Sequence, residues 1–167
     1  CGTSALGAAL AARGWAVTNS DFCEEAVGLL EELDGLGLLD PSRPQRRQPG
    51  SSEYVACNIL DPPPAWHQAF DVVVEKGLLD TLLFGSQADA LWRAERYAVS
   101  IAAVLRPGGV LLQLSDLPVE LRQELLQELW GGPSTTNSWD FHSFGTGCPP
   151  LSLLAARQRT GTEPSPG

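Results

Sequence analysis

Asp21, Asn58 and Glu75 each stand at or near the end of a short run of apolar and β-branched residues. Runs of this kind predict buried strands. In parallel α/β sheets, ligands bind at the carboxyl ends of the strands. A carboxylate there can accept hydrogen bonds from hydroxyl groups or take up a proton, and an amide oxygen can accept from an amino group. The sequence therefore predicts a polar ligand site built from strand ends.

Gly2 stands directly before residues 5–13, which carry apolar residues at helical spacing. In a turn that leads into a helix, glycine lets the backbone pass close to a ligand, and the exposed N–H groups of the helix face that ligand. Taken alone, Gly2 predicts no more than an ordinary tight turn.

Helical and strand patterns alternate along the chain and must position these residues. We expect helices over 5–13, 22–33, 87–105 and 117–130, and strands over 15–20, 54–59, 70–75, 110–114 and 151–156. Asp116 is expected to cap the last helix. Residues 40–52 are expected to form a surface loop, and 158–167 a disordered tail.

This alternation demands parallel strands joined by right-handed crossovers. We therefore predict an α/β fold with a three-layer, mostly parallel, Rossmann-like sheet. One domain over residues 1–157 is expected to contain it.

Composition excludes several classes of protein. Twenty acidic residues against eleven basic ones give a net charge of −9, which disfavours binding to a phosphate backbone. No apolar run reaches the roughly 20 residues of a membrane-spanning helix. The cysteines, at positions 1, 23, 57 and 148, form no C-x-x-C pair. Free thiols and no metal site are expected, in an intracellular compartment.

Four segments, taken in order, resemble motifs of the class I S-adenosylmethionine-dependent methyltransferases. They are Cys1-Gly2-Thr3-Ser4, Asp21-Phe22, the strand and turn over residues 70–77, and Leu105-Arg106-Pro107-Gly108-Gly109. The Glu75-Lys76-Gly77 step after the Phe-Asp-Val-Val-Val strand is similar to that of small protein-lysine methyltransferases. Those enzymes modify elongation factor 1A or mitochondrial citrate synthase, and residues 111–116 are most similar to the citrate synthase enzyme.

The resemblance implies S-adenosylmethionine as the cofactor. It implies that N–H groups after Gly2 face the methionine carboxylate and that Asp21 binds the ribose hydroxyls. It also implies that Asn58 accepts from the adenine amino group. Asp61 is the alternative to Asn58, and a helix cap is the alternative for Asp21. The implied cofactor-binding residues are Cys1, Gly2, Asp21, Phe22, Asn58, Ile59 and Glu75.

Catalysis is assigned by the same resemblance to Glu75, with Lys76 as a second candidate. Methyl transfer is an in-line displacement, so an enzyme contributes mainly orientation and a carboxylate near the cationic sulfur. A lysine substrate must also lose a proton, which a carboxylate can accept. Trp139, Phe141 and Phe144 either wall a channel for the target side chain or pack against the last strand.

The predicted function is methyl transfer to a lysine of a protein such as citrate synthase or elongation factor 1A. The predicted compartment is mitochondrial or cytoplasmic. A catalytically inactive binding module and a small-molecule methyltransferase are the alternatives. A dehydrogenase is disfavoured because no Gly-x-Gly-x-x-Gly motif surrounds Gly2. Family members carry a first strand before the segment that matches Cys1, so the resemblance implies that this strand is missing from the chain.

Overall fold

The computed structural model describes residues 2, 4–39, 50–131, 139–145 and 151–159. The chain divides into two compact units, residues 1–59 and residues 60–167, and each is described by itself.

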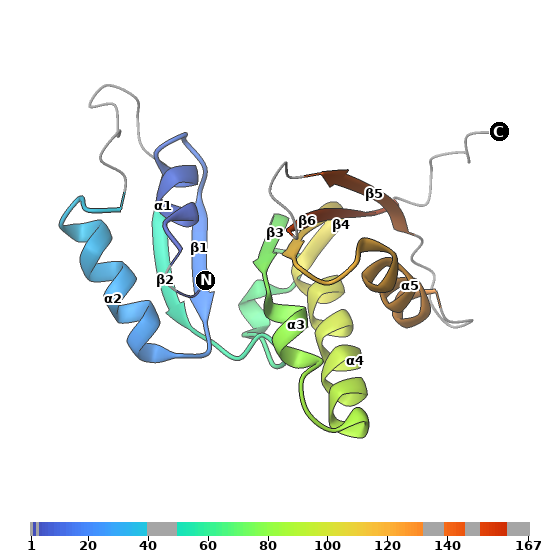
Figure 1. The fold of residues 1–167 in the computed structure, drawn as a ribbon. Coiled ribbons are helices and arrows are strands. Elements are labelled where there is room, and N and C mark those ends of the chain that lie inside the picture. The colour runs from blue at the N-terminus through green and yellow to red at the C-terminus, as the bar shows by residue number, and fades with distance from the viewer. Residues whose placement is uncertain (1, 3, 40–49, 132–138, 146–150, 160–167) are drawn as a thin grey trace. The chain divides into compact units, whose positions relative to one another are not determined.

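The first unit contains two helices and a pair of parallel strands (Figure 1). In chain order its elements are α1 (Leu6–Ala11), β1 (Val17–Asp21), α2 (Glu24–Gly35) and β2 (Ser52–Ala56). Both helices pack against the two strands. The structure thus confirms the two helices and two strands expected in this part of the chain.

Strand β2 ends earlier than the sequence indicates. It runs to Ala56, so Asn58 and Ile59 follow the strand and lie at the start of a turn. Of the expected loop, residues 40–49 lie outside the described residues, and Ser52 already belongs to β2.

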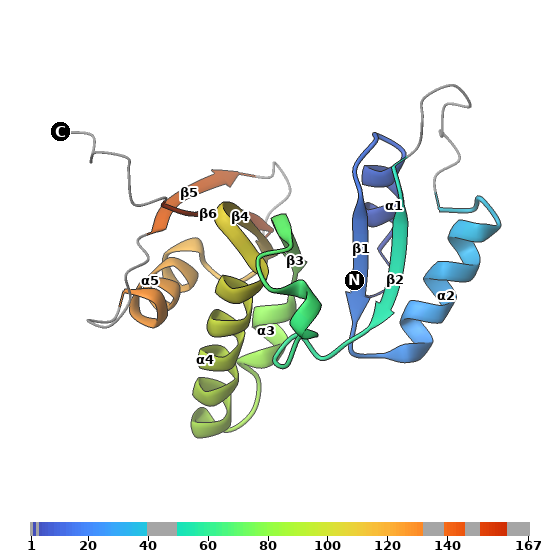
Figure 2. The same cartoon turned by 180° about the vertical axis from the view of Figure 1, so that it is seen from behind.

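The second unit contains a four-stranded sheet with the order β3-β4-β6-β5 (Figures 1 and 2). Its elements are a 3-10 turn (Pro64–Trp66), β3 (Phe70–Lys76), α3 (Leu78–Leu82), α4 (Gln87–Val104), β4 (Leu105–Ser115), α5 (Val119–Trp130), β5 (Trp139–Gly145) and β6 (Ser152–Gln158).

This sheet is mixed, whereas the sequence predicted a mostly parallel one. Strands β3 and β4 are parallel, but β6 is antiparallel to both β4 and β5. Parallel neighbours need a long crossover, whereas consecutive antiparallel strands need only a short connection. The residues between β5 and β6 are too few for a crossover, so these two strands must be antiparallel. Strand β5 itself was not expected from the sequence.

Strand β4 begins at Leu105, although the sequence predicted a helix through residue 105 and a strand only from Val110. Phe70 pairs with Leu105, but Val72 pairs with Val110, so the ladder shifts register between these two pairs. The shift absorbs the Pro-Gly-Gly segment into the strand, as bulges do.

The prediction that Asp116 caps α5 is wrong. The helix begins at Val119 with Pro118 at the N-cap position, and no side chain caps it. Instead, the Leu117 N–H donates to Ser115 Oγ at 2.9 Å. Proline favours this boundary because it fixes its own φ near −65° and needs no hydrogen-bond acceptor.

Helices α4 and α5 contact each other and the sheet, so one sheet face forms the core of this unit. That face presents Leu111, Gln113 and Ser115 of β4 beside Leu154 and Ala156 of β6, all of them buried. The Trp130 side chain links the two helices by donating from Nε1 to the Ala98 carbonyl at 2.9 Å.

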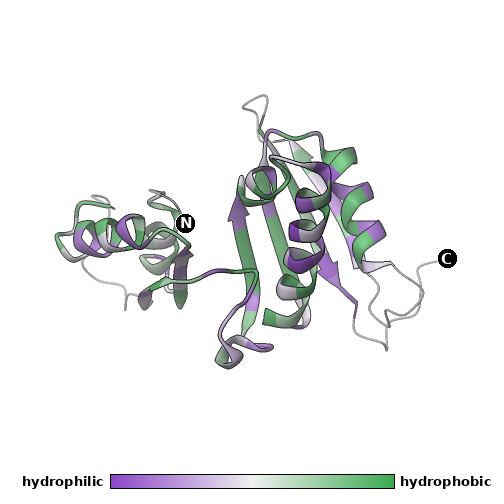
Figure 3. Cartoon of the chain, turned by 90° about the horizontal axis from the view of Figure 1, so that it is seen from below, coloured by the Kyte–Doolittle hydropathy of each residue, from purple (hydrophilic) through white to green (hydrophobic). Residues whose placement is uncertain are grey.

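Hydrophobic and hydrophilic residues share the surfaces of the helices, as amphipathic packing requires (Figure 3). The buried face of α4 carries Ala90, Ala94, Tyr97, Ala98, Ile101 and Val104. No helix in the described part of the chain is long and apolar enough to cross a membrane.

Candidate cofactor-binding and active-site residues

Gly2 and Asp21 are joined by a hydrogen bond in the first unit. The Gly2 N–H donates to Asp21 Oδ2 at 2.6 Å, and the Cys23 N–H donates to Oδ1 at 3.0 Å. Gly2 has φ +54°, a conformation that favours glycine. The Asp21 carboxylate therefore ties the segment before α1 to the end of β1. Cys1 lies outside the described residues.

The pKa of Asp21 is lowered to about 2. Partial burial raises this pKa, and the hydrogen bonds from the Cys23 and Gly2 N–H groups lower it because they favour the charged form. Asp21 is therefore ionised at neutral pH. The N-cap residue of α2 is Cys23, so Asp21 does not cap the helix from the N-cap position itself.

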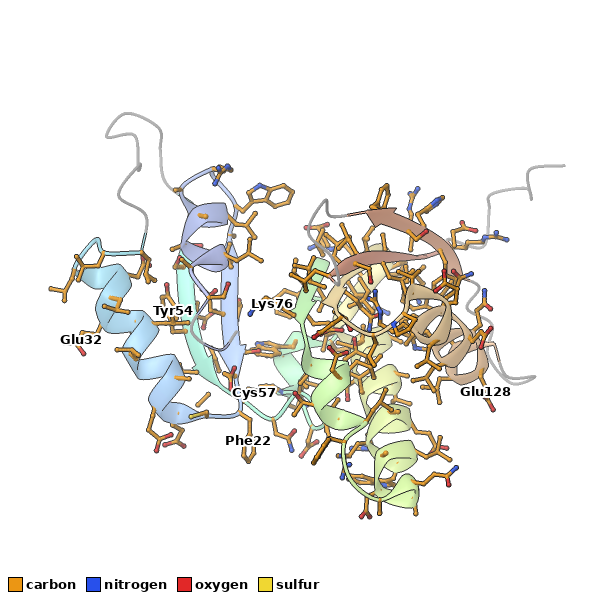
Figure 4. All side chains as sticks on the ribbon, in the orientation of Figure 1. Phe22, Glu32, Tyr54, Cys57, Lys76 and Glu128 are labelled. Carbon is orange, nitrogen blue, oxygen red and sulfur yellow. The ribbon has the colours of Figure 1, made fainter. Side chains whose placement is uncertain are left out.

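The remaining cofactor candidates of this unit lie close to the ends of β1 and β2. Phe22 follows β1 and is 80% exposed, with its ring projecting from the ribbon (Figure 4). Asn58 is exposed and Ile59 is half-buried just past β2. Asp61, the alternative to Asn58, is exposed and belongs to the second unit.

Glu75 lies at the carboxyl end of β3 and is only 6% exposed. Its Oε2 accepts a hydrogen bond from the Leu78 N–H at 2.8 Å. Gly77 makes this contact possible because its φ of +69° turns the chain sharply from β3 into α3. The carboxyl group thus satisfies an N–H group in the first turn of α3, a local role that the sequence did not indicate.

The pKa of Glu75 is raised to about 7. Burial is the largest cause, and the nearby Asp80 carboxylate adds to it. The Leu78 and Leu79 N–H groups and the Arg122 guanidinium act in the opposite direction. A buried carboxyl group that titrates near neutrality can donate or accept a proton at physiological pH.

Lys76 does not share this environment. Its side chain is exposed (Figure 4). Alternation along β3 directs it to the face opposite that of Glu75. The two candidates for catalysis therefore do not lie on one face of the sheet.

Two fully buried polar residues near Glu75 were not predicted from the sequence, namely Gln113 and Arg122. Gln113 is the register partner of Glu75, and its Nε2 donates to the Tyr97 hydroxyl at 3.0 Å. A signal was present, since Gln113 is the one polar residue in the otherwise apolar run 110–114. Buried polar residues need partners, so such a position marks a hydrogen-bond network.

Arg122 of α5 is also fully buried and holds the end of the sheet together. It donates to the carbonyl groups of Leu117, Gln113 and Ser152 at 3.2–3.3 Å, and to Ser152 Oγ at 2.6 Å. These bonds connect α5 to β4 and β6. Its positive charge also favours the ionised form of Glu75.

Packing accounts for two of the three aromatic residues considered for a substrate channel. Trp139 stacks on Trp130 with ring centres 3.9 Å apart, and Phe141 lies 6.4 Å from Trp130. Phe144 is 53% exposed. Within the described ranges, no group of three or more His, Cys, Asp and Glu residues could hold a metal ion.

No family model and no curated protein matches the sequence. Solved structures do match. A SAM-dependent methyltransferase from Methanosarcina mazei is 16% identical, with 95% of this chain and 89% of that chain covered and a TM-score of 0.64. The N-methyltransferase NodS from Bradyrhizobium japonicum, solved with S-adenosyl-L-homocysteine, is 18% identical, with coverages of 95% and 74% and a TM-score of 0.57.

A third structure is the 1,6-didemethyltoxoflavin-N1-methyltransferase from Burkholderia thailandensis. It is 18% identical, with 86% of this chain and 61% of that chain covered and a TM-score of 0.51. At these identities the likeness is one of fold. The chain therefore has a mixed α/β fold similar to that of S-adenosylmethionine-dependent methyltransferases.

Proposed function

We propose that this protein is a methyltransferase that uses S-adenosylmethionine and modifies a lysine side chain of a protein. The observation that carries the proposal is the methyltransferase-like fold over 95% of the chain. Acidic residues at the carboxyl ends of β1 and β3 support it, because ligands of α/β sheets bind at such ends.

The residues of the first unit fit this cofactor. Asp21 is ionised and lies at the carboxyl end of β1, and a carboxylate accepts hydrogen bonds from hydroxyl groups. It would hold the ribose hydroxyls. Phe22 and Ile59 offer apolar surface for the adenine ring, and the Asn58 amide oxygen can accept from its amino group. Gly2 and Cys1 would approach the methionine part.

A bound cofactor would supply a methyl group on a positively charged sulfur. The neutral lysine nitrogen would form a bond to the methyl carbon while the carbon–sulfur bond broke, and the electron pair of that bond would go to sulfur. The nitrogen then carries an extra proton, which must leave. Glu75 is our candidate to orient the amine and take up a proton, because its pKa of about 7 suits this task.

The protein substrate is inferred from the Glu75-Lys76-Gly77 step and from charge. The net charge of −9 favours a basic, lysine-bearing partner over a phosphate backbone. Citrate synthase and elongation factor 1A are the partners to test, and the location we propose is correspondingly mitochondrial or cytoplasmic.

A second candidate function is methylation of a small molecule. The observation that favours it is the fold likeness to the didemethyltoxoflavin enzyme, whose name states a small-molecule substrate. A catalytically inactive binding module is the third reading, and it differs from both in that it transfers no methyl group.

The test combines cofactor binding with methyl transfer. Calorimetry measures binding of S-adenosylmethionine to the chain, and labelled cofactor reports transfer to citrate synthase and elongation factor 1A. Variants of each partner with the target lysine changed to arginine identify the acceptor. Transfer that disappears with one such variant supports the proposal. Binding without transfer to any protein contradicts it, and labelling of RNA or small molecules alone overturns the substrate class.

A further inference from the structure

Glu75 and Gln113 lie side by side on the buried face of the second unit's sheet. They are register partners on the parallel strands β3 and β4, so their side chains point to the same face. Gln113 is completely buried and Glu75 is 6% exposed. Tyr97 of α4, also completely buried, reaches this face and bonds to Gln113.

Two oxygen atoms in this cluster lack partners. Among the described residues, neither Glu75 Oε1 nor Gln113 Oε1 has a hydrogen bond. The other carboxyl oxygen of Glu75 accepts from Leu78, and the Gln113 NH₂ group donates to Tyr97. Buried acceptors without donors are costly, and a proton on the Glu75 carboxyl group would give the Gln113 oxygen a donor from the neighbouring strand.

We propose that Gln113 and Tyr97 are positioning residues for a proton on Glu75. In the observed orientation of the amide, neutral Glu75 donates from Oε1 to Gln113 Oε1. When the proton leaves, the Gln113 amide turns over. Its Nε2 then donates to the Glu75 carboxylate, and its Oε1 accepts from the Tyr97 hydroxyl.

Both states of the cluster leave the Glu75 and Gln113 oxygens with partners. An amide has a donor end and an acceptor end, and a hydroxyl group both donates and accepts. A half-turn of one side-chain amide therefore serves either protonation state. An apolar residue at position 113 could serve neither state.

The groups that influence the charge of Glu75 come from the three helices α3, α4 and α5. Asp80 of α3 favours the neutral form, whereas Arg122 of α5 and the N–H groups of Leu78 and Leu79 favour the ionised form. Tyr97 of α4 completes the set, and burial raises its pKa, so it remains a neutral hydroxyl. Burial raises the pKa of Glu75 most, and together with these opposed influences it places that pKa at about 7, where the amide can change orientation at physiological pH.

This arrangement gives Glu75 a reversible proton inside the protein core. Its use in turnover rests on the proposed methyl transfer, in which Glu75 takes up the proton that the amine releases. The hydrogen-bond switch itself does not depend on that function.

Nuclear magnetic resonance of the full chain tests the switch directly. The side-chain carboxyl carbon of Glu75, identified by its loss in Glu75→Gln, should titrate near neutrality. The Gln113 side-chain NH₂ resonances should move with the same midpoint and stop titrating in Glu75→Gln. If the Gln113 resonances of the unsubstituted protein do not change with pH, the proposal is overturned.

Substitutions then separate the two positioning residues. Gln113→Met should raise the Glu75 midpoint by about one pH unit, because a hydrogen bond to the charged form is worth more than one to the neutral form. Tyr97→Phe should shift it less, since it weakens both states. An unchanged or lowered midpoint in Gln113→Met contradicts the proposal, as does a larger shift in Tyr97→Phe.

The pH profile of methyl transfer provides the link to function. If the proposed function holds, its acidic limb should follow the Glu75 midpoint and move with it in Gln113→Met. An acidic limb that stays in place would show that the switch does not serve turnover. Absence of any methyl transfer would overturn the proposed function while the resonance titrations still decide the switch.

Discussion

Asn19 of β1 occupies the space that a side chain at Gly7 of α1 would need. A Cβ atom built on Gly7 would lie 1.7 Å from Asn19 Oδ1, far inside any real contact. Asn19 is buried, and its Nδ2 donates to the Glu53 carbonyl of β2 at 3.3 Å. Helix α1 therefore approaches the strands closely only because residue 7 has no side chain.

Gly7→Ala should destabilise the chain by about 1–3 kcal/mol, the usual range for overpacking a core. Gly28→Ala is the matched control, since it lies inside α2 with nothing within 4 Å of its built Cβ. The control should stabilise by about 0.5–1 kcal/mol because alanine favours helix. Urea unfolding measures both, and equal effects would contradict the close approach.

Glu75 should make stability depend on pH. Its folded pKa of about 7 exceeds the ordinary 4.5, so the folded state holds more protons between these values. Stability from Glu75 is then complete below about pH 4.5 and is lost as pH rises through 7. Glu75→Gln should remove this loss, which amounts to roughly 3 kcal/mol.

Urea unfolding of both proteins at pH 5 and pH 8 checks this. Glu75→Gln should gain stability relative to the unmodified chain as pH rises. If the two proteins differ in free energy of unfolding by the same amount at both pH values, folding does not raise the pKa of Glu75.

Substitution of Glu75 should lower the rate of methyl transfer without weakening cofactor binding. If Glu75 acts on the amine, Glu75→Gln should lower kcat on the order of 10² while the cofactor Kd changes little. Glu128→Gln on the exposed surface of α5 is the control (Figure 4). Single-turnover transfer with labelled cofactor measures the rate, and full activity in Glu75→Gln removes the residue from the mechanism.

Asp21→Ala should weaken binding of S-adenosylmethionine by about 1.5–3 kcal/mol, the range for hydrogen bonds to a charged group. That corresponds to a rise in Kd of roughly 10- to 150-fold. Glu32→Ala, an exposed change on α2, should leave the Kd unchanged. If calorimetry gives the same Kd for Asp21→Ala as for the control, Asp21 serves only to tie Gly2 and Cys23 to β1.

Arg122→Met should destabilise the second unit by about 2–4 kcal/mol. The change removes the buried donors that the carbonyl groups of Gln113 and Ser152 accept from. Arg106→Ala removes an arginine whose bridge to Asp71 is largely exposed, so it should cost less than about 1 kcal/mol. Hydrogen exchange of β4 and β6 localises the effect, and similar losses in both variants would contradict it.

Local pattern was sufficient to predict most of the elements. The apolar spacing in α4 and the valine-rich run of β3 were recognised because helices and strands repeat every 3.6 and 2 residues. The same pattern predicted that β1 ends at Asp21 and that Glu75 lies at the end of β3. Strand β5 was missed because aromatic, polar and glycine residues are mixed along it.

The surroundings of Glu75 were decided by tertiary structure. Alternation along β3 says that Glu75 and Lys76 face opposite ways, but it does not say which face is covered by helices. Gln113 and Tyr97 come near Glu75 only because β4 pairs with β3 and α4 packs on β4. Strand pairing and helix packing are contacts between distant parts of the chain, and their energies depend on how the whole core fills. The sequence by itself therefore placed a carboxyl group at a strand end, and only the folded core made it a group that titrates near neutrality.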